Sequence, residues 1–153
     1  MSTTLYEQDF YSWVYQQSNL LREGKFEQLD LAHLIEELED LGNRHYDQLE
    51  SRFIQLIAHL LKWQVQHWKQ TNSWRATIRI QRTAIAKLLR RNPGLKSRLE
   101  EALNESWSEA RDLAIAFGWA EPIAETDLPD EQFPEICPFS LEQIMNSDFW
   151  PNP

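Results

Sequence analysis

Features that commonly reveal a protein's function are scarce in this chain of 153 residues. Its single cysteine, Cys137, cannot form an internal disulfide and has no partner ligands nearby at metal-binding spacing, which favours a reducing, cytoplasmic compartment. No apolar run approaches the roughly 18 to 20 residues of a membrane helix, and the N-terminus lacks the pattern of an export signal. We therefore expect a cytoplasmic protein that does not enter a membrane.

Motifs of the common hydrolytic and nucleotide-binding sites are also missing. The sequence contains no glycine-rich phosphate loop, no Gly-x-Ser-x-Gly turn and no zinc signature. These absences favour a protein that is not an enzyme, and we expect no cofactor.

Acidic residues are absent from the middle of the chain, although the whole is acidic with a formal net charge of −9. Residues 51–99 contain eleven Lys or Arg and no Asp or Glu. Residues 1–50 contain three Lys or Arg and eleven Asp or Glu, and residues 100–153 contain one Lys or Arg and thirteen Asp or Glu. A basic segment between two acidic ones predicts a charge-divided surface. Hydrophobic residues make up 42% of the chain, and together with the length this favours a single domain over residues 1–153.

Hydrophobic periodicity predicts an all-α protein, an antiparallel bundle of about four helices with one long helix. The first helix is expected from Glu7 to Arg22. The second follows the N-cap Asp30 and carries an apolar stripe from Leu31 to about His67, roughly 37 residues. The stripe keeps its phase across Gly42, which favours one continuous helix, while a break at this glycine stays open as an alternative.

Two further helices complete the predicted bundle. The third follows the capping residues 71–73 and ends at Asn92, and the fourth runs from Leu95 to Phe117. Residues 119–139 are rich in proline and acids, which predicts an extended strap that wraps the basic middle of the chain. Its expected anchors are Ile123, Leu128, Phe133, Ile136 and Phe139. Ser140 is expected to cap a short last helix, residues 140–149.

Several short motifs resemble those of a known family. They are Thr4 to Phe10 (TLYEQDF), Leu34 to Glu39 (LIEELE), His59 to Trp63 (HLLKW), Ser73-Trp74 followed by Ile78 and Gln81-Arg82, and Pro138 to Ile144 (PFSLEQI). Together they are similar to the bacterial domain-of-unknown-function family 29, from about Thr4 to Phe149. The resemblance implies a small helical domain found largely in cyanobacteria, and it implies no activity, cofactor or partner.

His59, Lys62 and Glu37 are the catalytic candidates that the residues themselves suggest. A partly buried imidazole titrates near neutrality and can act as an acid, a base or a ligand. His59 lies about 80° to one side of the centre of the buried stripe, which equally fits a histidine that bonds a carboxylate or carbonyl at the edge of the bundle. We favour the structural role and name no catalytic residue.

A metal site is a further alternative, since Glu36, Glu37, Glu39 and Asp40 could combine with His33, His59 and His67 of the same helix. Di-metal bundles usually carry a Glu-x-x-His pair on one helix, and that pair is missing here. Asp30 and His33 have the same spacing, but Asp30 is better used as an N-cap. We expect no metal.

Four arginines form a basic stripe beside the apolar face of the third helix, namely Arg75, Arg79, Arg82 and Arg90. Such a stripe can neutralise phosphates of a nucleic acid, or it can pair with internal carboxylates, and we predict that Arg82 pairs with Glu36 or Glu37. We therefore favour a non-enzymatic module that binds another protein or a second copy of itself. The alternative is a nucleic-acid-binding or nuclease-type effector that uses this stripe with His59.

Overall fold

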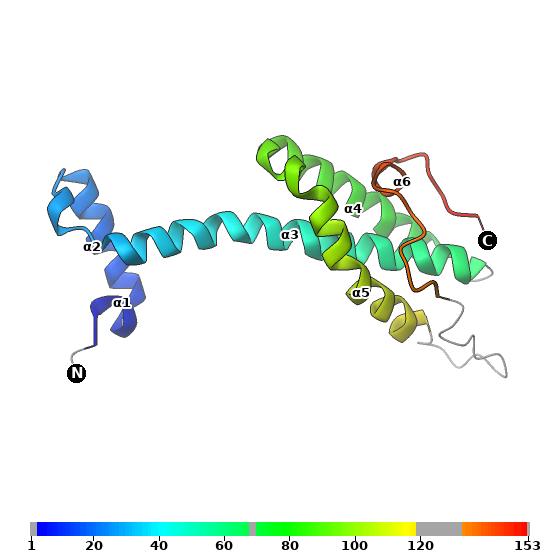
Figure 1. Cartoon of the computed structure of the whole chain (residues 1–153), viewed down its shortest axis with the longest axis horizontal. Helices are drawn as coiled ribbons and strands as arrows, with labels where there is room; N and C mark the ends of the chain where they lie inside the picture. Colours follow the sequence, from blue (N-terminus) through cyan, green and yellow to red (C-terminus); the bar gives the residue numbers. More distant parts are fainter. Residues whose placement is uncertain (1–2, 68–69, 119–132, 153) are drawn as a thin grey trace. The chain divides into compact units, whose positions relative to one another are not determined.

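The computed structural model describes residues 3–67, 70–118 and 133–152. The chain divides into two compact units, Met1–Arg44 and His45–Pro153. Their described elements are all helical (Figure 1), and they comprise α1 (Leu5–Gln8), α2 (Phe10–Arg22), the 3-10 helix η1 (Phe26–Gln28), α3 (Leu31–Val65), α4 (Asn72–Arg91), the 3-10 helix η3 (Pro93–Arg98), α5 (Leu99–Gly118) and α6 (Leu141–Met145). The all-α bundle prediction is confirmed, with no strand among the described residues. The single-domain assignment stays a prediction.

Two short helices replace the predicted helix from Glu7 to Arg22, which is wrong at its start. The backbone of Asp9 leaves the helical region, and its side chain accepts a hydrogen bond from the backbone N–H of Ser12 at 3.0 Å, so that α2 begins at Phe10. Thr4 caps α1 in a capping box with Glu7. An Asp that can serve as an N-cap competes with helix continuation, because its carboxylate satisfies N–H groups that would otherwise lack partners.

The long helix α3 is continuous through Gly42, so the alternative of a break there is wrong. It ends at Val65, two residues before the predicted end at His67. A glycine lowers helix stability by only about 1 kcal/mol relative to alanine, which the burial of the apolar stripe farther along the same helix readily exceeds.

The apolar stripe of α3 is not buried along its whole length. In the second unit Leu49, Phe53, Leu56 and Leu60 are completely buried, as predicted. In the first unit Leu31, Ile35 and Leu38 lie on the same stripe but are exposed, contrary to the prediction. The first unit offers only the short helices α1, α2 and η1 to cover this part of α3, and its buried residues in α2 are Trp13 and Gln17.

The core of the second unit lies between α3, α4 and α5. Along the chain α4 runs back beside α3, and α5 reverses direction again (Figure 1). A polar contact joins α3 to α5, since the hydroxyl of Tyr46 donates to Glu105 at 2.6 Å. Ser106 Oγ lies 3.3 Å from the carbonyl of Glu50 in α3 and 2.6 Å from that of Ala102 in its own helix. The buried residues that α4 contributes to this core include Ile78, Ile85, Leu88 and Leu89.

The fourth predicted helix begins later than expected. Residues Pro93–Arg98 form a 3-10 helix, and the α-helix starts at Leu99 instead of Leu95. Proline suits the first position of such a turn because it has no N–H to leave unpaired.

The structure tests the predicted strap only from Phe133 onward. Residues 119–132, with the expected anchors Ile123 and Leu128, lie outside the described residues. Phe133 and Phe139 are buried anchors, as predicted, whereas Ile136 is 81% exposed and is not an anchor. Arg111 of α5 holds this segment by donating to the carbonyls of Phe133 and Pro134. Ser140 caps α6 as expected, but that helix is shorter than predicted and ends at Met145.

No helix in the described part of the chain combines the length and the apolar character that crossing a membrane requires.

Replacing Trp63 by alanine tests the core of the second unit. Trp63 is 7% exposed, and its ring centroid lies 4.8 Å from that of Trp150, so truncation leaves a large cavity. We expect the free energy of unfolding to fall by about 3 to 5 kcal/mol, measured by guanidinium titration. Tyr11→Ala, at a position that is 71% exposed, is the control and should change it by less than about 0.5 kcal/mol. A loss below about 1 kcal/mol for Trp63→Ala would contradict this packing.

Candidate functional site

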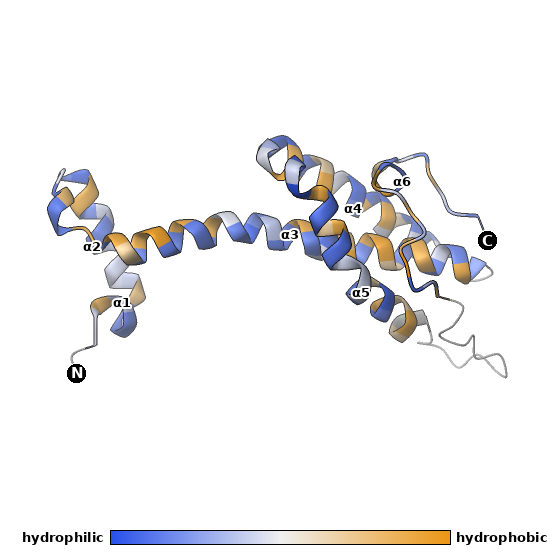
Figure 2. Ribbon diagram, viewed as in Figure 1, coloured by the Kyte–Doolittle hydropathy of each residue, from blue (hydrophilic) through white to orange (hydrophobic). Residues whose placement is uncertain are grey.

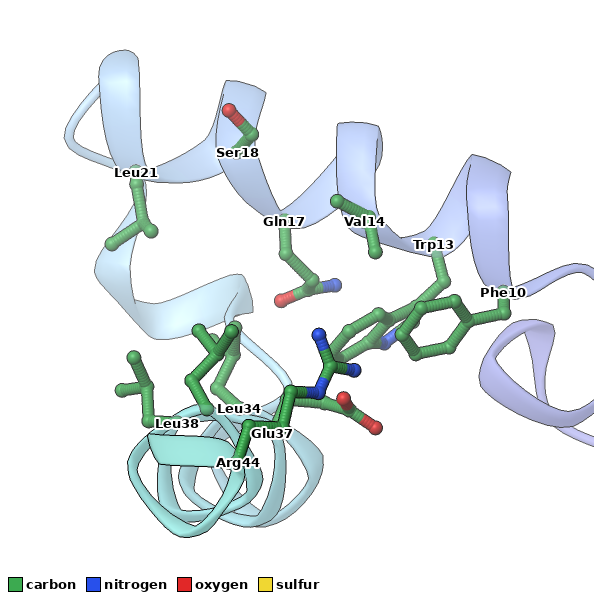
Figure 3. Close-up of a pocket in the computed structure, with 11 residues that line it drawn as sticks. Phe10, Trp13, Val14, Gln17, Ser18, Leu21, Leu34, Glu37, Leu38 and Arg44 are labelled. Carbon is green, nitrogen blue, oxygen red and sulfur yellow. The ribbon is translucent and has the colours of Figure 1, made fainter. Parts of the chain in front are cut away.

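A pocket of about 350 Å³ lies in the first unit, between α2 and the N-terminal turns of α3 (Figure 3). Side chains of α2 point across it toward Leu34 and Leu38 of α3. Its apolar lining consists of Phe10, Trp13, Val14, Leu21, Leu34, Leu38 and Leu41, and its polar lining consists of Gln17, Ser18, Glu37 and Arg44. The pocket is therefore mainly apolar, with one carboxylate and one guanidinium.

Hydrogen bonds to Asp30 hold α2 against the start of α3. The indole Nε1 of Trp13 donates to the Asp30 carboxylate at 3.0 Å, and the backbone N–H of Asp30 donates to Gln17 Oε1 at 2.8 Å. The same carboxylate lies 2.7 Å from Nδ1 of His33, and this contact is the largest cause that lowers the pKa of Asp30. Trp13 and Gln17 are buried, and each forms one of these hydrogen bonds with Asp30. These contacts hold the α2 wall of the pocket against the start of α3.

Glu37, one of the three catalytic candidates, serves as a hydrogen-bond acceptor at this pocket. The hydroxyl of Tyr6 donates to it at 2.5 Å, which is the main reason that the pKa of Tyr6 is raised to about 12. The Tyr6 ring also stacks on His33, with centroids 3.8 Å apart. Tyr6 was not among the predicted site residues, and its place in the motif from Thr4 to Phe10 is the one sequence signal that points to it.

Exposed hydrophobic side chains are concentrated in the first unit. Among the described residues thirteen large hydrophobic side chains are exposed, and eleven of them belong to residues 1–44. Five of the eleven line the pocket, namely Phe10, Val14, Leu21, Leu38 and Leu41. Figure 2 shows hydrophobic residues on the turns of α3 beside α2. A contiguous apolar surface of this kind usually marks a binding site.

The basic stripe of α4 does not form in the predicted way, because Arg82 is only 5% exposed. Its Nε donates to the carbonyl of Ile144 at 2.8 Å and its Nη2 to that of Gln143 at 3.3 Å. The predicted pairing with Glu36 or Glu37 is therefore wrong. The last carbonyls of a helix lack partners within the helix, and this guanidinium supplies donors for two of them in α6. Burial lowers the pKa of Arg82.

The neighbouring arginines contact aromatic rings. The guanidinium carbons of Arg75, Arg79 and Arg82 lie 5.9, 6.0 and 5.7 Å from the ring centroid of Trp150, and that of Arg75 lies 5.6 Å from Trp63. Arg75, Arg79 and Arg90 are exposed. Within the described residues none of these arginines forms an ion pair with a carboxylate. Cation–π contact replaces the expected charge pairing, and no sequence signal pointed to Trp150, which follows the last predicted helix.

The structure brings His59 and Lys62 together at a second pocket, of about 270 Å³, in the second unit. Nδ1 of His59 donates to the carbonyl of Gln55 at 2.8 Å, as the structural interpretation of this histidine expects. Lys62 is 7% exposed, and its Nζ lies 4.9 Å from the ring centroid of Trp74. Burial lowers the pKa of both groups. Glu37 belongs to the first unit, so the three catalytic candidates are divided between the two units.

No group of three or more His, Cys, Asp or Glu side chains within the described ranges is arranged to hold a metal ion. The carboxylate–histidine contact between Asp30 and His33 joins two residues that are three positions apart at the start of α3.

The described elements define an all-α helical-bundle protein in which the second unit is built on three long helices. The chain matches the family model described as Domain of unknown function DUF29 over residues 5–150, and it belongs to this family. No curated protein and no solved structure matches the chain.

The role of Arg82 can be tested by Arg82→Met, which keeps much of the side-chain volume but removes the donors. Because the carbonyls of Ile144 and Gln143 then lose the hydrogen bonds from the guanidinium, we expect the free energy of unfolding to fall by about 1 to 3 kcal/mol in a guanidinium titration. Arg79→Met is the matched control, since Arg79 also lies near Trp150 but is exposed, and we expect a change below about 0.5 kcal/mol. Equal effects of the two substitutions would show that the hydrogen bonds to α6 contribute nothing specific.

Proposed function

We propose that the protein is a non-enzymatic interaction module whose first unit binds an amphipathic helix of another protein. The observation that carries the proposal is the fixed, mainly apolar pocket between α2 and α3, with exposed hydrophobic side chains along its lining. A helix that lays its apolar face into a hydrophobic groove is a common mode of peptide recognition, and it needs an apolar surface of this type.

The charge of the first unit specifies the partner further. Residues 1–44 contain nine Asp or Glu and three Lys or Arg, a formal charge of −6. Glu36, Glu37 and Asp40 lie close enough to Tyr6 to raise its pKa, so negative charge gathers beside the pocket. A partner helix with Lys or Arg on the flanks of its apolar face complements this field. Glu37 already accepts a hydrogen bond from Tyr6, which favours a binding role over a catalytic one.

Two synthetic helical peptides of about 18 residues test this proposal, one with leucines on one face and lysines elsewhere, the other with glutamates in place of the lysines. We expect the full chain to bind the Leu/Lys peptide in a fluorescence-anisotropy titration and to bind the Leu/Glu peptide at least about tenfold more weakly. Leu38→Asn should weaken the binding by at least about tenfold, because Leu38 is a pocket residue that is 65% exposed.

Ile80→Asn is the matched control, since Ile80 is 60% exposed on α4 and does not line this pocket, and binding should be unchanged. Equal binding of both peptides, or equal effects of Leu38→Asn and Ile80→Asn, would contradict the proposal. Light scattering tests whether the chain forms a dimer. A dimer that Leu38→Asn abolishes would show that the partner is a second copy of this chain and not another protein.

The alternative function is nucleic-acid binding by α4, which carries six Lys or Arg and no acidic residue. Exposed Arg75, Arg79 and Arg90 can contact phosphates, and Trp150 supplies an aromatic ring beside the first two. If this function holds, single-stranded DNA, duplex DNA or RNA binds with an affinity that falls as salt rises, and Arg75→Gln with Arg79→Gln reduces that salt dependence. Arg22→Gln with Lys25→Gln, in the first unit, is the matched control. No binding at low salt would exclude this alternative.

A further inference from the structure

Lys62 is a buried cation for which the described residues provide no anion. A lysine side chain is almost never buried without a partner, because its ammonium loses its water and keeps three hydrogen-bond donors. Here the contact is with the face of Trp74, and no described carboxylate forms an ion pair with the ammonium. Burial lowers the pKa of Lys62.

The pocket beside Lys62 has one polar side and one apolar side. The polar side consists of Gln55, His59 and Lys62, and the apolar side consists of Ala58 and Leu113. The hydrogen bond from Nδ1 of His59 to the Gln55 carbonyl holds the imidazole ring in place. The other ring nitrogen, Nε2, has no partner among the described residues. A fully hydrated inorganic anion would gain nothing from the apolar side, whereas an organic anion would use both sides.

We propose that this pocket binds a small organic carboxylate. Its oxygens accept charge-assisted hydrogen bonds from the Lys62 ammonium and a hydrogen bond from the Gln55 amide, and its short apolar body lies against Ala58 and Leu113. A volume of about 270 Å³ limits the ligand to a molecule smaller than most cofactors. The site lies in the second unit and shares no residue with the helix-binding pocket, so it does not depend on the function proposed above.

Titration of the full chain with sodium benzoate and sodium butyrate, at constant ionic strength and followed by amide NMR shifts, tests the site. We expect saturable shifts for residues of α3 and α5 around the pocket. Benzyl alcohol, which has the apolar body without the charge, and sodium phosphate, which has the charge without the apolar body, should each bind at least about tenfold more weakly.

Lys62→Met should abolish benzoate binding while the melting temperature stays equal or rises, because the substitution removes a buried charge that has no ion-pair partner among the described residues. Lys87→Met removes the same charge from an exposed position on α4 and should bind benzoate as the natural chain does. If Lys62→Met does not fold, Leu113→Trp provides the second test, since the larger side chain fills the pocket and should block binding. Saturable binding that survives Lys62→Met or Leu113→Trp would overturn the proposal, as would phosphate binding more tightly than benzoate, or no saturation by either carboxylate.

Discussion

The apolar stripe of α3 is the constraint on which both units depend. In the second unit α4, α5 and the segment from Phe133 to Ile144 cover it, and this burial supplies the dominant favourable term in folding. In the first unit the same stripe continues with Leu31, Ile35 and Leu38, but only short elements are available to pack on it. The feature that stabilises the second unit therefore leaves the first with exposed apolar side chains, which is the type of surface that the proposed helix binding requires.

Three arginines of α4 are stabilised by groups other than carboxylates. Arg82 donates to two backbone carbonyls, and Arg75, Arg79 and Arg82 lie around the ring of Trp150. A guanidinium suits such surroundings, because its planar fork can bond carbonyls while its face stacks on an aromatic ring. An ammonium is more strongly hydrated and cannot make both contacts in this way, and the contact described for Lys62 is with the face of Trp74 alone.

Much of the fold follows from the sequence because it depends on local rules. The period of 3.6 predicts α3 and α4, and the capping residues Thr71 and Ser140 begin helices where capping chemistry indicates. The split at Asp9 shows the limit of periodicity, since the apolar spacing continues across a residue whose carboxylate ends one helix and caps the next. The extent of each stripe that is buried depends on how many helices cover it, and no local pattern contains that information.

The candidate sites were harder to predict, because their decisive contacts join distant parts of the chain. His59 and Lys62 lie one turn apart on α3, so their shared pocket follows from spacing, but its apolar wall includes Leu113 of α5. The error over Arg82 has the same origin. Charge complementarity suggested a glutamate, whereas the acceptors that Arg82 contacts are carbonyls of α6, 61 and 62 residues farther along the chain. A buried guanidinium needs acceptors more than it needs a formal counter-charge, and the carbonyl end of a helix provides them even in an acidic protein.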